Sequence, residues 1–215
     1  TRYPLVTGVQ TCALPILWLT TGMITKQWVA VHRKHHRFCE QRQDPHSPKQ
    51  FGLLRVLFGG ALLYHEASKD KDMVNTYGVG TPTDWLELHL YTPHSRLGIS
   101  ILLLLNIWLW GWVGLLIWGI QMIWIPFWAA GVINGVGHYW GYRNGKTKDN
   151  SRNISPWGII IGGEELHNNH HLEPASPRLS KKWYEFDIGW LYIKLFSIVG
   201  LLSVRKHFLL TSKIL

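Results

Sequence analysis

Six of the twelve histidines fall into two clusters with the same spacing, and both clusters are suited to binding a metal ion. On an α-helix, positions i, i+3 and i+4 lie on one face about one turn apart, so an H-x-x-H-H run gathers three imidazoles. Neutral imidazole is a good ligand for iron, copper, nickel and zinc. One such cluster can be a surface patch, whereas two identical spacings predict a shared metal centre. The clusters are His32-Arg33-Lys34-His35-His36 and His167-Asn168-Asn169-His170-His171.

A third polar feature is the pair Asn134 and His138, four residues apart in the run NGVGH. On a helix the two side chains share a face. They lie at the end of an apolar stretch, where unpaired polar groups are costly. We interpret His138 as a further metal ligand and Asn134 as its companion, reaching the metal directly or through water. The alternative is a pair satisfied by water or backbone.

Carboxylates near the second cluster are candidates for supporting the ligands. Glu164 and Glu165 lie within one turn of it, where they could accept imidazole N–H groups and fix the tautomer. The alternative is a solvated acidic pair. His46 is interpreted as a loop residue or a support for the ligands. The remaining histidines have no neighbour at ligand spacing and are expected at the surface: His65, His89, His94 and His207.

The element that must position both clusters is a long apolar segment. Residues 97–142 contain no Asp, Glu, Lys or Arg, and as a helix they would extend roughly 69 Å at about 1.5 Å per residue. A bilayer core is only about 30 Å thick, so the segment predicts two crossings. Gly111 and Gly114 mark the expected turn. Two crossings bring both flanks to the same side, where the clusters can meet, whereas one crossing would separate them by about 30 Å.

The rest of the chain is expected to form helices at the membrane surface. Residues 17–38 predict one helix whose first half is apolar and second half polar. One Asp-Pro pair and one Ser-Pro pair, at 44–48, then break helix continuity. Residues 49–96 are expected to form surface helices and loops against the bilayer. The tail, 181–215, alternates basic and apolar residues, which favours amphipathic helices against the cytoplasmic part or the membrane surface.

Composition supports a membrane protein over a nucleic-acid-binding one. The net charge is +9, but the basic residues flank the apolar segment and are interspersed with acids. This distribution is typical of cytoplasmic loops and disfavours a nucleic-acid partner. Thirteen tryptophans suit the membrane interface. The two cysteines, Cys12 and Cys39, are too few for a disulfide framework and form no CxxC pair. We therefore assign the metal chemistry to imidazole.

The first sixteen residues are expected to be non-native. The run Val6 to Ile16, VTGVQTCALPI, resembles the translation of a common sequencing adapter. The chain has no start methionine and no signal-peptide layout. We expect the natural sequence to begin near Leu17, already inside a longer protein.

Four motifs together resemble those of the membrane fatty acid desaturases, most nearly the bacterial acyl-CoA delta-9 type: HRKHH, DPHSP, NGVGHYWGYRN and GEELHNNHH. The resemblance extends from residue 17 to the C-terminus. It implies an all-α integral membrane protein, with one central transmembrane hairpin and a truncated N-terminal helix. A cytoplasmic helical cap would carry a di-iron site ligated almost wholly by histidine, beside a narrow acyl tunnel. The expected parts are 17–96 with the second histidine box, the hairpin 97–142, and 143–215 with the third box.

The resemblance also implies a ligand set. The family's second box corresponds to His32, His35 and His36, and its third box to His167, His170 and His171. His138 corresponds to the additional ligand, with Asn134 as its water-mediated companion. The family has a further box, H-x-x-x-x-H, upstream of the second, and no histidine precedes His32 here. We therefore expect that two ligands and at least one membrane crossing are missing from this chain.

The implied reaction is the O2-dependent introduction of a cis double bond into a fatty acyl chain, acyl-CoA or lipid-linked, in lipid metabolism. An unactivated C–H bond offers no acidic proton or leaving group, so a redox cofactor must supply the chemistry. The cofactor implied is two iron ions cycling between Fe2+ and Fe3+, with O2 as co-substrate. An external carrier such as ferredoxin, rubredoxin or a cytochrome with its reductase would supply electrons, since the chain has no CxxC or GxGxxG motif. The expected location is the inner (cytoplasmic) membrane, with the boxes facing the cytoplasm.

Three alternatives remain open on the sequence alone. A related di-iron hydroxylase or alkane oxygenase would use the same histidines. A non-enzymatic His-rich membrane metal transporter would need polar ligands within the membrane, and residues 97–130 offer only Asn106, Gln121 and one serine. A haem-binding cytochrome would need histidines on facing helices in the bilayer, which the clustered spacing disfavours.

Overall fold

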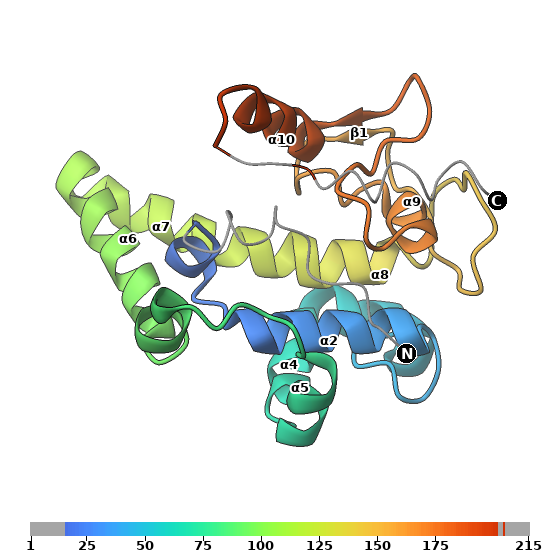
Figure 1. Ribbon diagram of the computed structural model, residues 1–215, viewed down its shortest axis with the longest axis horizontal. Helices are drawn as coiled ribbons and strands as arrows, with labels where there is room; N and C mark the ends of the chain where they lie inside the picture. Colours follow the sequence, from blue (N-terminus) through green and yellow to red (C-terminus); the bar gives the residue numbers. More distant parts are fainter. Residues whose placement is uncertain (1–15, 202–203, 205–215) are drawn as a thin grey trace.

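The computed structural model describes residues 16–201 and 204, and this part of the chain is largely helical (Figure 1). Its strands are two residues each, β1 (Trp157–Gly158) and β2 (Phe186–Asp187), paired in parallel. The prediction of an all-α fold is therefore confirmed. Residues 1–15, on which most of the expected non-native segment falls, lie outside the described residues, as do Cys12 and His207.

The predicted single helix over 17–38 is wrong, because the chain breaks at Gly22. Residues 16–21 are helical, and α2 (Thr25–Phe38) begins after the break. Gly22 has φ +63°, a left-handed conformation that glycine adopts readily and other residues avoid. A Cβ there would lie 2.8 Å from the carbonyl oxygen of Ser95. The break therefore lets the chain pass close to the start of α6, and the end of α2 carries the first histidine cluster.

Short helices follow, as expected for residues 49–96. Ser47 and Asp70 begin two of them, since their side chains accept hydrogen bonds from the backbone N–H groups of Lys49 and Met73. The helices α2, α4 and α5 pack around a small apolar core of Ala30, Val31 and Met73. Their contact with a bilayer stays a prediction. The elements are α3 (Pro48–Phe51), α4 (Leu53–Ser68), α5 (Lys71–Tyr77) and the π-helix η1 (Glu87–Tyr91).

The apolar segment forms a helical hairpin that turns at Gly111, as predicted. Gly111 has φ +58° and separates α6 (Ser95–Trp110) from α7 (Trp112–Ile125). Gly114 is not part of the turn but lies inside α7, where a Cβ would be 2.0 Å from the carbonyl oxygen of Asn106. Its role is to let the two helices approach closely. The second arm continues through the π-helix η2 (Pro126–Ile133) into α8 (Asn134–Val136).

The two arms differ in length. Residues 112–136 form one continuous apolar helix of 25 residues, long enough for a bilayer core of about 30 Å. The first arm, α6, has 16 residues, or about 24 Å of helix. Large apolar side chains such as Trp108 and Trp112 are exposed on the hairpin. Among the described residues, one helix is therefore long and apolar enough to span a membrane, with α6 as a shorter partner.

Two polar side chains inside the hairpin satisfy each other. The Asn106 amide donates to the side-chain oxygen of Gln121 at 3.4 Å and to the carbonyl of Leu102 at 2.8 Å. The Trp118 indole donates to the carbonyl of Ile99 at 3.0 Å. Such bonds between helices offset the cost of polar groups in an apolar surrounding.

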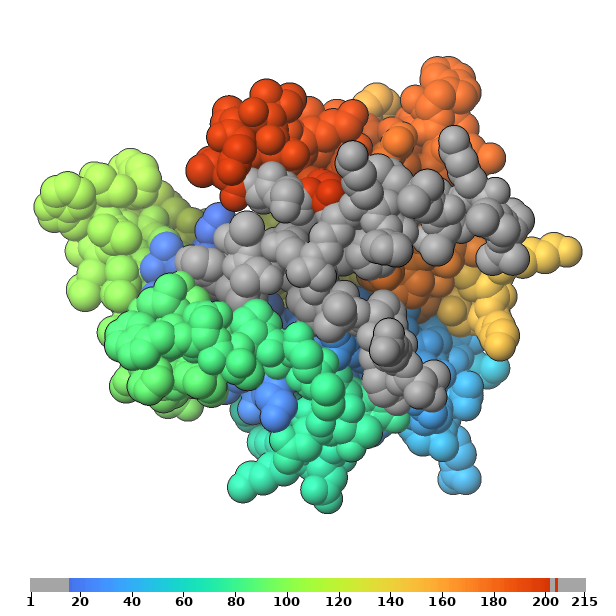
Figure 2. Space-filling model, viewed as in Figure 1, coloured from blue at the N-terminus to red at the C-terminus, as the bar shows by residue number. Residues whose placement is uncertain are grey.

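Small residues also bring α4 against the second arm. A Cβ on Gly60 would lie 2.1 Å from the carbonyl oxygen of Ala130, and one on Gly131 would lie 2.2 Å from that of Leu57. The backbones therefore touch where these helices cross. The hairpin projects to one side (green in Figure 2), while α8 ends between α2 and the C-terminal part of the chain (Figure 1).

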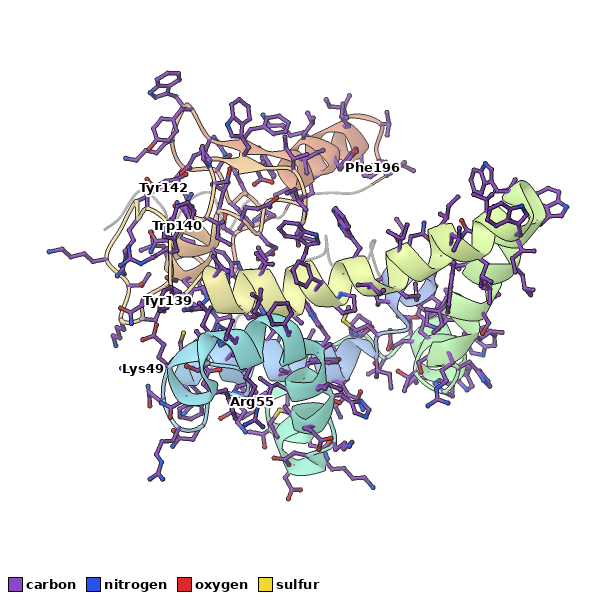
Figure 3. The ribbon with its side chains drawn as sticks, turned by 180° about the vertical axis from the view of Figure 1, so that it is seen from behind. Lys49, Arg55, Tyr139, Trp140, Tyr142 and Phe196 are labelled. Carbon is purple, nitrogen blue, oxygen red and sulfur yellow. The ribbon has the colours of Figure 1, made fainter. Side chains whose placement is uncertain are left out.

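The C-terminal part covers the end of α8. It contains α9 (His167–Leu172), which carries the second histidine cluster, and α10 (Ile188–Ile198). Seen from behind, Tyr139 and Trp140 lie just after the end of α8, and Phe196 lies on α10 (Figure 3). Tyr139 and Trp140 are exposed.

Candidate metal centre

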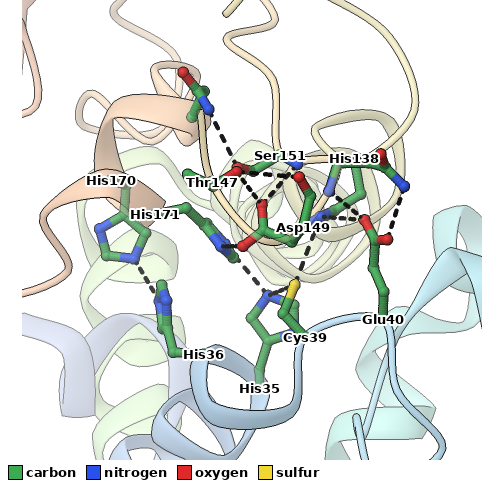
Figure 4. Close-up of polar contacts among 12 residues, drawn as sticks. His35, His36, Cys39, Glu40, His138, Thr147, Asp149, Ser151, His170 and His171 are labelled. Atoms are coloured by element: carbon green, nitrogen blue, oxygen red, sulfur yellow. Dashed lines mark hydrogen bonds and ion pairs between the residues drawn. The ribbon is translucent and has the colours of Figure 1, made fainter. Parts of the chain in front are cut away.

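The two histidine clusters, separated by about 130 residues of sequence, meet between α2 and α9 (Figure 4). The Nε2 atoms of His36 and His170 are 2.9 Å apart, and those of His35 and His171 are 3.4 Å apart. The prediction that the clusters come together is confirmed.

A first group consists of His32, His36 and His170. Their Nε2 atoms are separated by 3.1, 2.9 and 3.2 Å. Metal–imidazole bonds of about 2.0–2.1 Å would put neighbouring ligand nitrogens roughly 3 Å apart. A cation at their centre would satisfy all three converging nitrogens at once, so this donor set fits a metal ion.

A second group contains four imidazoles from three parts of the chain. The Nε2 atoms of His138 and His167 are 3.0 Å apart, beside the pair His35 and His171. The His171 ring centre lies 4.8 Å from that of His138 and 4.5 Å from that of His167. All seven predicted histidine ligands therefore lie in one cluster, which divides into these two groups.

Carboxylates hold the outer nitrogens of these rings. Asp44 Oδ1 lies 2.9 Å from Nδ1 of His35, and Asp149 Oδ2 lies 3.0 Å from Nδ1 of His171. When Nδ1–H donates to a carboxylate, the lone pair is left on Nε2, facing the centre. Sequence reasoning missed both acids. Asp44 stands in the quoted DPHSP motif, which was a usable signal, whereas nothing in the sequence marks Asp149.

Cys39 also belongs to the second group and was missed. Its Sγ lies 3.9 Å from Nε2 of His35 and 3.8 Å from Nδ1 of His138. With His35, His138 and His171 it offers ligand atoms that all lie within 4.8 Å of one another. The available signal was its position four residues after His35, the same spacing that joins His32 to His36.

The structure gives the predicted supporting residues different surroundings. Glu165 Oε1 accepts hydrogen bonds from the backbone N–H groups of Ile160 at 2.5 Å and Ile161 at 3.2 Å, which shapes the loop before α9. Burial raises the pKa of Glu164 to about 7, and nearby His32 opposes that shift. Asn134 begins α8 one turn before His138. The roles of Glu164, Glu165 and Asn134 toward the metal stay predictions.

The described histidines outside the predicted ligand set differ in burial. His46 is buried and its ring stacks on His35, with centres 4.4 Å apart, so it packs against a predicted ligand. His65, His89 and His94 are exposed, as expected.

Burial keeps the imidazoles of the two H-x-x-H-H clusters neutral. Burial first, and neighbouring imidazoles second, lower the pKa of His32 from 6.5 to about 3 and that of His170 to about 4. The pKa values of His35 and His171 are lowered in the same way. Neutral imidazole is the form that binds a metal. Burial, together with Asp149, Asp44 and Glu40, raises the pKa of the Cys39 thiol.

Amide side chains between the histidines anchor α9. Asn168 Oδ1 accepts from the backbone N–H of Asn144 at 2.9 Å. Asn169 donates to Glu185 Oε2 at 2.9 Å, and the other oxygen of Glu185 accepts from Tyr142 at 2.7 Å and Asn144 at 2.5 Å. The two residues inside the H-x-x-H-H run therefore fix the helix that presents three of the predicted ligands.

Comparison with known proteins points in one direction. The family model for fatty acid desaturases matches residues 8–194. The chain is 34% identical over 184 residues to the delta-9 desaturase-like 3 protein of Arabidopsis thaliana, covering 83% of this chain and 59% of that protein. It is 31% identical over 183 residues to delta-9 acyl-lipid desaturase 2 of the same plant, covering 83% and 57%. With the sn-1 stearoyl-lipid 9-desaturase of Anabaena variabilis, identity is 30% over 183 residues, covering 84% and 64%. The chain thus spans about three fifths of the length of these relatives.

Proposed function

Because the chain belongs to the fatty acid desaturase family, we propose that it is the larger part of a membrane enzyme that introduces a cis double bond into a fatty acyl chain. The observation that carries the proposal is the meeting of the two H-x-x-H-H clusters. Five ring nitrogens from α2 and α9 approach one another closely enough to share metal ions.

The cofactor proposed is a pair of iron ions, with O2 as co-substrate. His32, His36 and His170 would hold one ion. The other would be held by His35, His138, His167 and His171, with Asn134 reaching it through water. When bound, the iron pair would supply the O2-dependent redox chemistry that amino-acid side chains lack.

The protein's own contribution is to prepare these ligands. Asp44 and Asp149 accept the Nδ1 protons of His35 and His171, which fixes the tautomer and aims Nε2 inward. The histidines of both clusters are themselves largely buried, which limits the access of water to their ring nitrogens. The low pKa values keep the imidazoles free of protons that would compete with a cation.

The substrate is proposed to be a fatty acyl chain, lipid-linked or acyl-CoA. Two of the similar proteins carry acyl-lipid and stearoyl-lipid in their names, which supports a lipid-linked chain. Electrons would come from an external carrier such as ferredoxin, rubredoxin or a cytochrome with its reductase. Both flanks of the hairpin lead to the histidine cluster, which supports a cluster on one side of a membrane. The location proposed is the inner membrane, with this side facing the cytoplasm.

The parts of the chain would then divide the work. Residues 17–96 and 143–215 would form the cap that carries the second and third boxes, and 97–142 would anchor the cap in the membrane. A metal transporter is less well supported, because Asn106 and Gln121 bond to each other.

The experiment joins a full-length desaturase N-terminus to residue 17 onward and measures iron per chain and the oxidised lipid product. An alkene product, with two irons per chain and loss of both in His35→Ala, is the expected result. An alcohol product would favour the hydroxylase or alkane oxygenase instead. A protein without iron, or a His35→Ala variant with undiminished desaturation, would refute the site.

A further inference from the structure

We propose that Glu40 is a positioning residue for the second group of histidines, acting through His138 and through the loop that carries Asp149. The inference rests on the proposed function in taking the two groups of histidines as metal positions. The ligand set above gives Glu40 no role, and the proposal adds no ligand to either group.

Glu40 lies in a tight turn at the end of α2, in a backbone conformation that favours glycine. Cys39 has φ −45° and ψ 125°, and Glu40 has φ +64°. The N–H of Gln41 donates to the carbonyl of Phe38 at 2.8 Å. These values fit a type II β-turn with Glu40 as its third residue, where glycine or asparagine is usual. Among the described residues, Glu40 is the one non-glycine residue with a positive φ, so contacts of its side chain must hold this conformation.

Both oxygens of the Glu40 carboxylate bind one residue of a distant loop. Oε1 accepts a hydrogen bond from the backbone N–H of Asn150 at 2.6 Å, and Oε2 accepts one from the Asn150 side-chain amide at 2.7 Å. The Glu40 side chain is only 9% exposed, so water competes poorly for these bonds. This two-point contact joins the end of α2 to a loop 110 residues later in the sequence.

The same carboxylate faces the outer nitrogen of His138 (Figure 4). Glu40 Oε1 lies 3.6 Å from Nδ1 of His138, whose side chain is fully buried. Cys39 Sγ lies 3.8 Å from the same nitrogen, but thiol sulfur is a weak acceptor and a carboxylate is a strong one. A negative charge beside Nδ1 favours a proton there and leaves the lone pair on Nε2. That Nε2 lies 3.0 Å from Nε2 of His167, so Glu40 prepares the nitrogen of His138 that faces the metal position.

Glu40 also acts on a second imidazole of the same group through the loop that it holds. Asn150 directly follows Asp149, whose carboxylate lies 3.0 Å from Nδ1 of His171. Fixing Asn150 therefore fixes the backbone that presents Asp149 to this ring. Among the contacts of the described residues, none joins Glu40 to a histidine of the first group. Loss of the Glu40 carboxylate is therefore expected to weaken the second group selectively.

The test titrates the metal-free 215-residue chain in detergent with Co2+. Two backgrounds separate the metal positions: His36→Gln leaves the second group complete, and the double variant His138→Gln/His167→Gln leaves the first group complete. In the His36→Gln background, Glu40→Gln is expected to weaken Co2+ binding about 10- to 100-fold, the usual effect of losing a carboxylate that orients a ligand. In the double-variant background, Glu40→Gln is expected to leave Co2+ binding unchanged. The matched control is Glu66→Gln, which removes an exposed glutamate of α4 and is expected to change neither.

A second variant, Glu40→Gly, separates positioning of the rings from stability of the turn. Glycine adopts the positive φ without strain, so this variant is expected to unfold at no lower temperature than Glu40→Gln. Its Co2+ affinity at the second group is nevertheless expected to fall as far as that of Glu40→Gln. A Glu40→Gly variant that kept this affinity, or a Glu40→Gln variant that weakened both groups equally, would overturn the inference and leave the proposed function standing. A parent chain that bound no Co2+ at all would overturn the metal centre of the proposed function as well.

Discussion

Asp149 provides a direct test of how the cap prepares the metal centre. Its Oδ2 lies 3.0 Å from Nδ1 of His171, and its other oxygen accepts from Ser151 N–H at 2.9 Å and the Thr147 hydroxyl at 2.7 Å. The Asp149 side chain is 11% exposed and that of His171 is 1% exposed, so water replaces the contact poorly. Asp149→Asn keeps the shape but removes the charge that favours a proton on Nδ1.

The expected consequence is a weaker metal site in a protein that still folds. Loss of a carboxylate that orients a ligating histidine typically lowers metal affinity about 10- to 100-fold. That range corresponds to about 1.4–2.7 kcal/mol, because each factor of ten is about 1.4 kcal/mol. The bonds from Ser151 and Thr147 can persist on the asparagine oxygen, so we expect unfolding to change much less than metal binding.

The measurement is competition for Co2+ between the protein and a chelator, with Asp149→Asn compared to Asp72→Asn. Asp72 is exposed in the first turn of α5, away from the histidines, and serves as the matched charge control. Circular dichroism checks that helix content is retained. An Asp149→Asn variant that bound Co2+ as tightly as the Asp72→Asn control would refute the argument that this carboxylate sets the tautomer.

Three further predictions test the hairpin, the cap and the buried imidazoles. Gly114→Ala puts a Cβ 2.0 Å from a carbonyl oxygen of α6, whereas a Cβ on Gly119 would have nothing within 4 Å. We therefore expect Gly114→Ala to cost about 1–3 kcal/mol of stability and Gly119→Ala to have little effect. Equal unfolding temperatures of the two variants in detergent would contradict this. Glu185→Gln removes the charged acceptor of hydrogen bonds from Asn169, Tyr142 and Asn144, and each charged hydrogen bond lost costs about 1.5–3 kcal/mol. We expect a lower unfolding temperature and weaker Co2+ binding. Unchanged values would argue against an anchoring role for Glu185. For pH, the unfolded imidazoles take up protons near 6.5, whereas folded His32 and His170 do so only near 3 and 4. The folded state therefore loses stability as pH falls from about 6.5 toward 4, and an unfolding temperature of the metal-free protein that stayed constant between pH 7 and pH 5 would show that these rings are not buried as described.

The sequence alone determined the candidate ligands and the broad architecture. Helical spacing is a local property, so H-x-x-H-H predicts three imidazoles on one face whatever the surroundings. The charge-free stretch 97–142 likewise predicts a hairpin from length alone, and the turn at Gly111 agrees. Because a hairpin returns the chain to its starting side, the meeting of the two clusters was also predictable.

Other features were decided only by tertiary structure. Gly22 looked like a tolerable residue within a helix, but the close approach of Ser95 makes it a break. Gly114 looked like part of a turn, whereas its neighbour across the hairpin makes it a packing contact. In both cases a contact between distant segments decides the role of the glycine, so the neighbouring residues in the sequence do not predict that role.

The same reason explains the site residues that sequence reasoning missed. Asp149 supports His171 from a loop 22 residues earlier, and Cys39 contacts His138 across 99 residues. Their importance lies in distances set by the crossing of α4 with η2 and by the anchoring of α9. Spacing along the chain therefore identified which imidazoles could bind a metal, while the packing of distant segments decided which carboxylates and which thiol surround them.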